Sequence, residues 1–260
     1  MEFQELIGTR RSIRFFDPKR PVEQEKIQKI LEACLVASCA VNAHWLRAIV
    51  VKRDDIPKAE LEKLKNPVQA VVIELAPVHI YFYADLGVVN RVKGARLKEL
   101  VEKNIMGPTH GWSTKFVDEV VYPYILKPMT ESPHYPVMAA FDCGIAACQG
   151  LLMAFEQGLG ACLTAFAAPI IGAITKPPAD WFPLYQLNIG YSLESREAGG
   201  QRPRPAFEEQ YFLGKYGNPF PRDPKVVEEL KKSKVLQAPA PLPGRKEELR
   251  RLAKQLNLPE

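Results

Sequence analysis

The chain has 260 residues, of which 47% are hydrophobic and 25% charged, the composition of an ordinary globular protein with a sizeable core. Its net charge of +5 is mild, and no RNP, zinc-finger or basic-helix pattern accompanies it, so we expect an anionic small molecule and no nucleic acid as its partner. The N-terminal residues lack the apolar stretch of a signal peptide, and no run of about 18 apolar residues predicts a membrane span, so we expect a cytoplasmic protein.

The cysteines and histidines indicate neither a disulfide framework nor a metal site. The five cysteines are an odd number, and they lie in mostly apolar surroundings, which favours buried free thiols in a reducing compartment. The four histidines show no ligand spacing. Cys143 and Cys148 are not spaced to place two thiolates on one helix face.

A dense basic stretch, Arg10-Arg11-Ser12-Ile13-Arg14, follows a predicted short helix over residues 1–9. An arginine side chain offers a planar fork of donors that matches phosphate oxygens, and a serine hydroxyl adds a neutral donor. The stretch is therefore suited to hold a phosphate. Taken alone, the five residues do not decide the matter and slightly favour a solvated basic patch.

Apolar spacing and turn residues predict the elements that follow. Helices are predicted at 22–36, 54–65 (capped by Asp54-Asp55), 90–103 and 137–157, a short helix or turn at 169–174, strands at 47–52, 78–83 and 183–189, a strand or helix at 207–212, and two charged helical pieces in 219–260 around the linker 238–244.

Two of the longer stretches have distinctive compositions. Residues 112–135 combine prolines with tryptophan and tyrosines, which predicts an irregular lid or binding loop. Residues 137–157 are apolar on nearly all sides, which predicts a helix buried throughout at the centre of the core. Gly144 and Gly150 each cost this helix about 1 kcal/mol relative to Ala, and we interpret them as points of close approach by a neighbouring helix.

Common catalytic and phosphate-binding motifs are missing from the sequence. It contains no GxGxxG, GxxxxGK[ST], G-x-S-x-G or H-E-x-x-H, so Rossmann, NTPase and hydrolase interpretations lack motif support.

The order of several weaker motifs is more informative. They are Arg-x-Ser-x-Arg-x-Phe (10–16), Ala-Pro-Val-x-Ile (76–80), Asp-x-Gly-x-Ala (142–146), Gly-Leu-Gly-Ala-Cys (158–162), Ile-Gly-Tyr (189–191) and Arg-x-Arg-Pro-x-Phe-Glu-Glu (202–209). In this order the chain resembles the nitroreductase family of FMN-dependent flavoproteins over roughly residues 3–213. The resemblance implies an α+β fold with a mainly antiparallel central sheet flanked by helices, in an intertwined homodimer.

The resemblance also implies a division of the chain. Residues 1–213 would form the FMN-binding domain, with 86–135 as a lid or insertion. Residues 214–260 would be a C-terminal extension that packs on the surface or on the partner subunit, because they have little core-forming content of their own.

The FMN contacts implied by the resemblance come from several segments. Arg10, Ser12 and Arg14 would hold the phosphate and ribityl chain, with Arg11 close by, and Arg202 and Arg204 would complete the phosphate site. The turn with Ser38, Cys39 and Asn42 would reach the flavin from the partner subunit. Gln69 would contact the pyrimidine edge, and Leu163 and Thr164 would run past flavin N5.

The resemblance implies an FMN-dependent oxidoreductase that transfers hydride from NAD(P)H through flavin N5 to an electron-poor acceptor such as a nitro compound or quinone. The flavin would carry the chemistry, so no catalytic side chain is expected. The turn before Trp45 departs from the usual family sequence. Two alternatives therefore stay open, namely a flavin-dependent reductive dehalogenase or enoate-type reductase and a non-catalytic FMN-binding or sensing protein.

Overall fold

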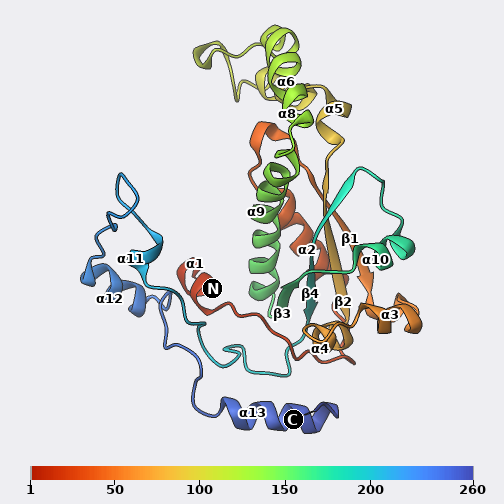
Figure 1. Cartoon of the computed structure of the whole chain (residues 1–260), viewed down its shortest axis with the longest axis vertical. Coiled ribbons are helices and arrows are strands. Elements are labelled where there is room, and N and C mark those ends of the chain that lie inside the picture. Colours follow the sequence, from red (N-terminus) through yellow and green to blue (C-terminus); the bar gives the residue numbers. More distant parts are fainter. Residues whose placement is uncertain (1, 260) are drawn as a thin grey trace.

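A four-stranded antiparallel sheet forms the centre of the protein. The structure, a computed structural model, describes residues 2–259. Within these residues the strand order is β1-β2-β4-β3 (Figure 1), and the strands are β1 (Leu46–Lys52), β2 (Val78–Asp85), β3 (Gly160–Thr164) and β4 (Trp181–Gly190). Helices flank both faces of the sheet. The predicted α+β fold with a mainly antiparallel sheet is confirmed.

The longest described helix, α9 (Tyr135–Glu156), packs beside α2 (Gln24–Leu35) on one face of the sheet. The other helical segments are α1 (Phe3–Thr9), η1 (Ala40–Asn42), η2 (Arg53–Asp55), α3 (Lys58–Leu64), α4 (Ala70–Leu75), α5 (Val88–Val92), α6 (Ala95–Glu102), η3 (Pro108–His110), α7 (Thr114–Phe116), η4 (Val117–Leu126), α8 (Lys127–Glu131), α10 (Ala168–Thr175), α11 (Phe207–Gln210), α12 (Pro224–Lys232) and α13 (Arg245–Leu256).

Strand β2 is buried along its whole length because both faces of the sheet are covered. Successive side chains of a strand point to opposite faces. Accordingly, Ile80 and Phe82 lie in the cluster formed with α2 and α9, while Tyr81 and Tyr83 pack with residues of α3, α4 and α10. This two-sided burial explains the continuous apolar and aromatic run by which the sequence predicts this strand.

Helix α9 is central, but the prediction that it is buried throughout is wrong. Val137, Met138, Phe141 and Ile145 are exposed, and the exposed fraction of Phe141 is 73%. These residues recur at helical spacing and form one apolar stripe. Length and composition alone would also allow α9 to cross a membrane, a test that the core helix of a soluble protein passes equally well.

The two glycines of α9 differ in their surroundings. A Cβ at Gly150 would lie 2.5 Å from the Sγ of Cys34 on α2, which confirms close approach by a neighbouring helix. A Cβ at Gly144 would meet no described atom of another segment within 4 Å. The same interpretation is therefore wrong for Gly144 within this chain.

The stretch 112–135 is mostly helical, and the prediction of an irregular segment is wrong. Helices α7, η4 and α8 follow one another directly from Thr114 to Glu131. Pro123 lies in the π-helical segment η4, and Pro128 lies in the first turn of α8, where a missing N–H costs little. Val117 and Val121 pack into a cluster around Trp45, which stabilises the helix despite its prolines.

Smaller differences concern element boundaries. The segment that begins with Gly160-Ala161-Cys162 forms strand β3, although these small residues carry no clear strand pattern. The predicted helix 54–65 begins later, at Lys58, because Asp54 and Asp55 form a 3-10 turn ahead of Pro57. The predicted helix 90–103 is two helices, α5 and α6, separated by Lys93 and Gly94 in left-handed conformation.

The C-terminal extension has two parts. Helix α12 lies in an arm that stands away from the sheet, together with α11, which precedes the extension, whereas α13 runs along the base of the core (Figure 1). Leu252 of α13 is fully buried there. The cysteines are free thiols in the described structure, but only Cys34, Cys143 and Cys162 are buried, while Cys39 is half-buried and Cys148 is exposed.

Candidate functional site

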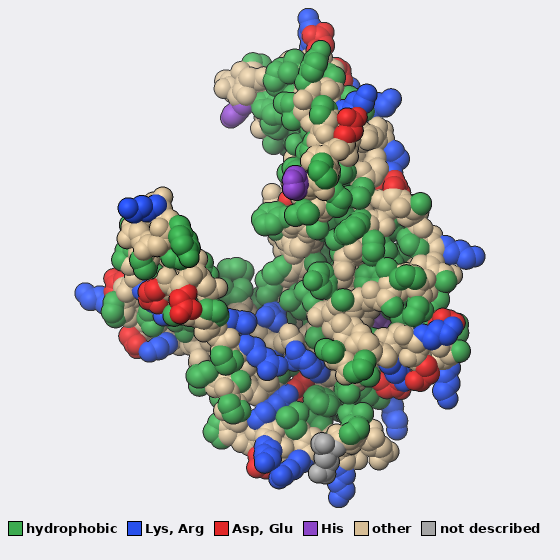
Figure 2. Space-filling model, in the orientation of Figure 1, with side chains coloured by type: hydrophobic (Ala, Val, Ile, Leu, Met, Phe, Trp, Pro, Cys, Tyr) green, Lys and Arg blue, Asp and Glu red, His purple; other side chains and the backbone are tan. Residues whose placement is uncertain are grey.

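The basic stretch after α1 meets the second arginine pair in one pocket. Arg10, Arg11 and Ser12 lie opposite Arg202 and Arg204 around a cavity of 180 Å³. Ile7, Ala198, Gln201 and Leu236 complete its wall. We call this cavity the basic pocket. Figure 2 shows Lys and Arg side chains gathered on this face, in the hollow between the arm and the core.

No acidic side chain lines the basic pocket among the described residues. Burial, and the nearby positive charge of Arg204, lower the pKa of Arg10. Burial, and the charges of Arg10, Arg202 and Arg204, likewise lower the pKa of Arg11. Like charges that repel one another in a partly buried site are stabilised by an anion.

Arg11 is the most enclosed of these arginines, with an exposed fraction of only 6%. Its Nη1 donates to the carbonyls of Gly8 and Arg10 at 2.7 and 2.9 Å, and its Nη2 donates to Oε1 of Gln237 at 2.9 Å. Its Nε is buried without a hydrogen-bond partner. The charge of Glu197 acts on Arg11 in the opposite sense to the other arginines, but no carboxylate of the described residues forms an ion pair with Arg11. A buried cation without a direct ion pair is costly, so the free donor and the unpaired charge fit a phosphate dianion.

The basic stretch also joins the sheet next to β3. Ser12 forms a parallel bridge with Ala161, and the backbone N–H of Ile13 donates to the Ala161 carbonyl at 3.0 Å. Arg14 does not line the basic pocket, and its Nη1 donates to the Ser12 carbonyl at 3.0 Å. The predicted residues Leu163 and Thr164 follow along the same strand, Leu163 being exposed and Thr164 half-buried. The structure thus places them beside the basic stretch.

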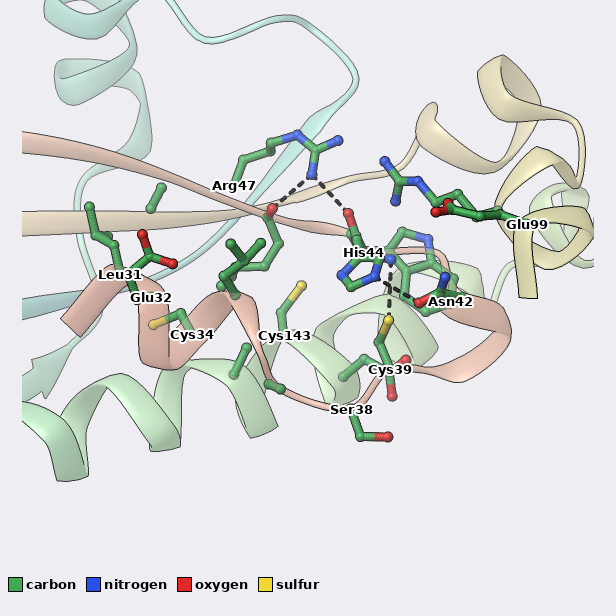
Figure 3. Close-up of a pocket in the computed structure, with 18 residues that line it drawn as sticks. Leu31, Glu32, Cys34, Ser38, Cys39, Asn42, His44, Arg47, Glu99 and Cys143 are labelled. Carbon is green, nitrogen blue, oxygen red and sulfur yellow. Dashed lines mark hydrogen bonds between the residues drawn. The ribbon is translucent and has the colours of Figure 1, made fainter. Parts of the chain in front are cut away.

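Ser38, Cys39 and Asn42 lie elsewhere, at a larger cavity of 620 Å³ that we call the turn pocket (Figure 3). It shares no lining residue with the basic pocket. Its wall comes from α2, the turn 37–45, β1, α6 and α9, and includes His44, Arg47, Arg96, Asp142 and Cys143. The two groups of predicted FMN contacts are therefore separate within one chain.

The turn 38–44 has an unusual backbone that several contacts hold in place. Val41, Asn42 and His44 all have φ near +50°, a region that costs energy for residues other than glycine. Asn42 Oδ1 and His44 Nε2 are 2.8 Å apart, and Cys39 Sγ accepts from the His44 N–H at 3.3 Å (Figure 3). Burial, and the charges of Arg96 and Arg47, lower the pKa of His44, which favours its neutral form.

An ionic cluster centred on the buried Asp85 holds this turn in place. Arg47 Nη1 donates to the carbonyls of His44 and Leu46, both at 2.8 Å, while its Nη2 pairs with Asp85 at 2.7 Å. Asp85 is 1% exposed and also pairs with Arg91, which in turn pairs with Asp180 at 2.6 Å. The end of β2 is thereby tied to the turn pocket.

Gln69 joins neither pocket. It lies at the start of α4, where its Oε1 accepts from Asn66 at 3.1 Å.

The structure adds residues for which the sequence carries no signal. Gln201, Leu236 and Gln237 reach the basic pocket or its arginines from loops without periodicity, and Arg96 reaches the turn pocket from a helix with several other exposed charges.

Comparisons with known proteins agree with this fold. The family model described as the nitroreductase family matches residues 7–191. No curated protein sequence matches the chain significantly.

Several solved structures share the architecture. A nitroreductase-like protein from Streptococcus mutans is 19% identical with a TM-score of 0.63, over 81% of this chain and 97% of that one. A protein from Staphylococcus epidermidis classed as an NAD(P)H:FMN oxidoreductase is 18% identical with a TM-score of 0.64, over 82% and 95%. A protein from Exiguobacterium sibiricum classed as a nitroreductase, solved in complex with FMN, is 21% identical with a TM-score of 0.61, over 79% and 94%.

At these identities the structural likeness supports the fold alone, whereas the family model covers most of the chain. The chain belongs to the nitroreductase family.

Proposed function

We propose that this chain is an FMN-dependent oxidoreductase that takes hydride from NAD(P)H and passes it to a small electron-poor acceptor such as a nitro compound or quinone. The observation that carries the proposal is the basic pocket. Arginines from two distant segments converge there without an acidic lining residue, and the buried Arg11 keeps a donor free. This donor set suits the terminal phosphate of FMN.

The residues divide into holding and orienting roles. Arg10, Arg11, Ser12, Arg202 and Arg204 would hold the phosphate, and Arg14 would reach the ribityl chain. Leu163 and Thr164 on β3 would lie along the ring. When bound, FMN would supply the hydride chemistry, so the chain's part is to bind and orient the cofactor and substrates. Gln69, at the start of α4, remains a proposed contact to the pyrimidine edge.

We also propose that the protein is a homodimer in which the turn pocket of one subunit completes the basic pocket of the other. Two observations support this. The apolar stripe of α9, which includes Phe141, is uncovered in the single chain, and exposed apolar patches of this kind mark protein interfaces. In addition, the two groups of predicted FMN contacts share no cavity within one chain.

Within this proposal, the protein acts in the cytoplasm, and residues 1–213 form its FMN-binding domain. Residues 86–135 would form a lid over the acceptor site. Their helices pack around Trp45 next to the turn pocket, and Arg96 and Glu99 of α6 line that pocket directly. Residues 214–260 form the extension.

Titration of the purified protein with FMN tests the phosphate assignment. Arg10→Ala should raise the Kd for FMN roughly tenfold or more, because a charge-assisted bond to phosphate is lost. The control is Arg250→Ala, which removes the same charge from an exposed position on α13. A wild-type protein that takes up no FMN refutes the proposal, as does equal affinity of the Arg10 variant.

Anaerobic addition of NADH or NADPH to the FMN-loaded protein distinguishes an enzyme from a binding protein. Loss of the yellow flavin colour supports the oxidoreductase, and a nitroaromatic or quinone should then restore the colour. Colour that persists with both nucleotides favours the non-catalytic alternative. Restoration by an enone or a halogenated aromatic alone favours the other flavin reductases.

A further inference from the structure

The segment 234–245 contacts both chain segments that supply arginines to the basic pocket, namely the stretch around Arg11 and the stretch that leads to Arg202. We call it the C-terminal strap. On one side it pairs with the chain just before Arg202. Gln201 bridges Pro239, and its backbone donates to the Ala238 carbonyl at 3.3 Å and accepts from the Ala240 N–H at 2.7 Å. The strap therefore fixes the backbone from which Arg202 and Arg204 extend.

The Gln201 side chain strengthens this pairing. Its Nε2 donates to the Val235 carbonyl at 2.9 Å, and its Oε1 accepts from the Gln237 N–H at 2.9 Å. Gly200 has φ of +110°, and a Cβ there would lie 3.1 Å from backbone atoms of Ala240. The chain can approach the strap this closely because position 200 is glycine.

On its other side the strap contacts α1 and Arg11. A Cβ at Gly8 would lie 2.0 Å from the Lys234 carbonyl oxygen, so α1 and the strap are in direct backbone contact. Gln237 Oε1 accepts from Arg11 Nη2 at 2.9 Å, while Gln237 Nε2 donates to the Lys234 carbonyl at 2.9 Å. This second bond fixes the side-chain oxygen towards Arg11.

The C-terminal end of the strap is anchored by a buried carboxylate. Glu194 accepts from the backbone N–H of Arg14 at 2.5 Å and from that of Phe15 at 3.1 Å, and it pairs with Arg245 at 2.7 Å. Although burial opposes it, hydrogen bonds to Glu194 and Glu248 raise the pKa of Arg245. The strap is thus tied to the basic stretch at a site where the cation has its own counter-charges.

The chemistry of the two anchors differs in a way that matters for ligand binding. Arg245 forms ion pairs with the carboxylates of Glu194 and Glu248. Arg11 instead donates a hydrogen bond to the neutral carboxamide of Gln237. A neutral acceptor orients a guanidinium without forming an ion pair with it. Gln237 therefore holds Arg11 in place without competing for it.

From these contacts we propose that the strap is part of the phosphate site. Gln237 is the positioning residue that aims Arg11, and pairing with Gln201 places Arg202 and Arg204, so that the pocket selects a flavin carrying a phosphate monoester over one without it. This inference rests on the proposed FMN site, and it gives the C-terminal extension a role in ligand choice rather than surface cover alone. Leu236 of the strap also forms part of the pocket wall.

The test compares FMN with riboflavin, which lacks the phosphate, in the full chain. Gln237→Ala should raise the Kd for FMN about tenfold, the size of one lost hydrogen bond to a charged group, and leave the Kd for riboflavin unchanged. Gln237→Glu should weaken FMN further, because its carboxylate pairs with Arg11 and repels the phosphate. The matched control, Gln255→Ala, alters a glutamine of the same extension that accepts from the exposed Arg251, and should change neither Kd.

A measurement on the wild-type protein makes the proposal independent of these variants. FMN should slow proteolytic cleavage within residues 234–245, and riboflavin at equal occupancy should not. The proposal is overturned if Gln237→Ala weakens both flavins equally, if Gln237→Glu binds FMN as tightly as the wild type, or if both flavins protect the strap alike. Failure of the wild type to bind any flavin would instead refute the proposed function.

Discussion

Asp85→Asn is the substitution whose effect the structure specifies most closely. The Asp85 carboxylate is 1% exposed and binds Arg47 at 2.7 Å and Arg91 at 2.5 Å. Asparagine keeps the shape but removes the charge and turns an N–H group towards cationic donors. Breaking a buried ion pair costs about 3–5 kcal/mol when the remaining charge stays buried.

The magnitude expected here reaches slightly below that range. The side chains of Arg47 and Arg91 are 27% and 52% exposed, so both regain water when Asp85 is neutralised. We therefore expect the free energy of unfolding to fall by about 2–3 kcal/mol. The turn 38–44 should also exchange its amide hydrogens faster, because Arg47 no longer holds the carbonyls of His44 and Leu46 in place.

Asp180→Asn is the matched control. Asp180 pairs with the same Arg91, but its side chain is 42% exposed, and exposed ion pairs contribute at most about 1 kcal/mol. Urea unfolding at one fixed protein concentration, analysed for a change in midpoint at constant slope, measures both variants. If Asp180→Asn costs as much as Asp85→Asn, burial does not set the strength of this cluster and the reasoning is refuted.

Three further predictions concern the core, its pH dependence and the exposed stripe of α9. Gly150→Ala should destabilise the protein by about 1–2 kcal/mol in urea unfolding, because the added methyl group contacts the Sγ of Cys34. Adding Cys34→Ala should recover most of that loss. As a control, Gly172→Ala should be neutral or stabilising, because no described atom of another segment lies within 4 Å of the added methyl group. Burial lowers the pKa of His79 to about 4, so the unfolded chain takes up the proton first as the pH falls. The free energy of unfolding should therefore decrease by about 3 kcal/mol between pH 6.5 and pH 4. The variant His79→Asn should lack this decrease in unfolding curves measured over the same pH series. Phe141→Glu should convert a dimer into a monomer in sedimentation analysis, and an unchanged mass would contradict the role proposed for α9.

Much of the sheet and its flanking helices could be predicted from the sequence because their residues carry a local signal. The buried strand β2 is a continuous apolar and aromatic run, and α2 follows helical spacing. Strand β3 was missed because Gly160, Ala161 and Cys162 are too small to show a strand pattern, and its position depends on pairing with β4. The sequence does not predict the helices α7 to α8, because proline usually interrupts a helix, although its positions in η4 and α8 tolerate it.

The candidate site likewise contains residues that sequence motifs indicate and residues that only the fold brings together. The order of motifs pointed to Arg10, Arg11, Ser12, Arg202 and Arg204, and the structure brings these residues to one pocket. The contact of Gln237 with Arg11 spans almost the whole chain and leaves no periodicity, so only the folded structure reveals it. Periodicity also cannot show whether an apolar helix face meets the core or a second molecule, so the sequence does not predict the exposed side of α9.

The charge of Arg11, which has no ion pair among the described residues, has a consequence for how the stability of the protein depends on its ligand. A buried cation without a counter-ion lowers the stability of the empty protein, and an anion that binds only the folded state restores it in proportion to the logarithm of its concentration. The free energy of unfolding should therefore rise with the concentration of the phosphate-bearing ligand. The ligand-free protein should therefore be the form that unfolds most readily.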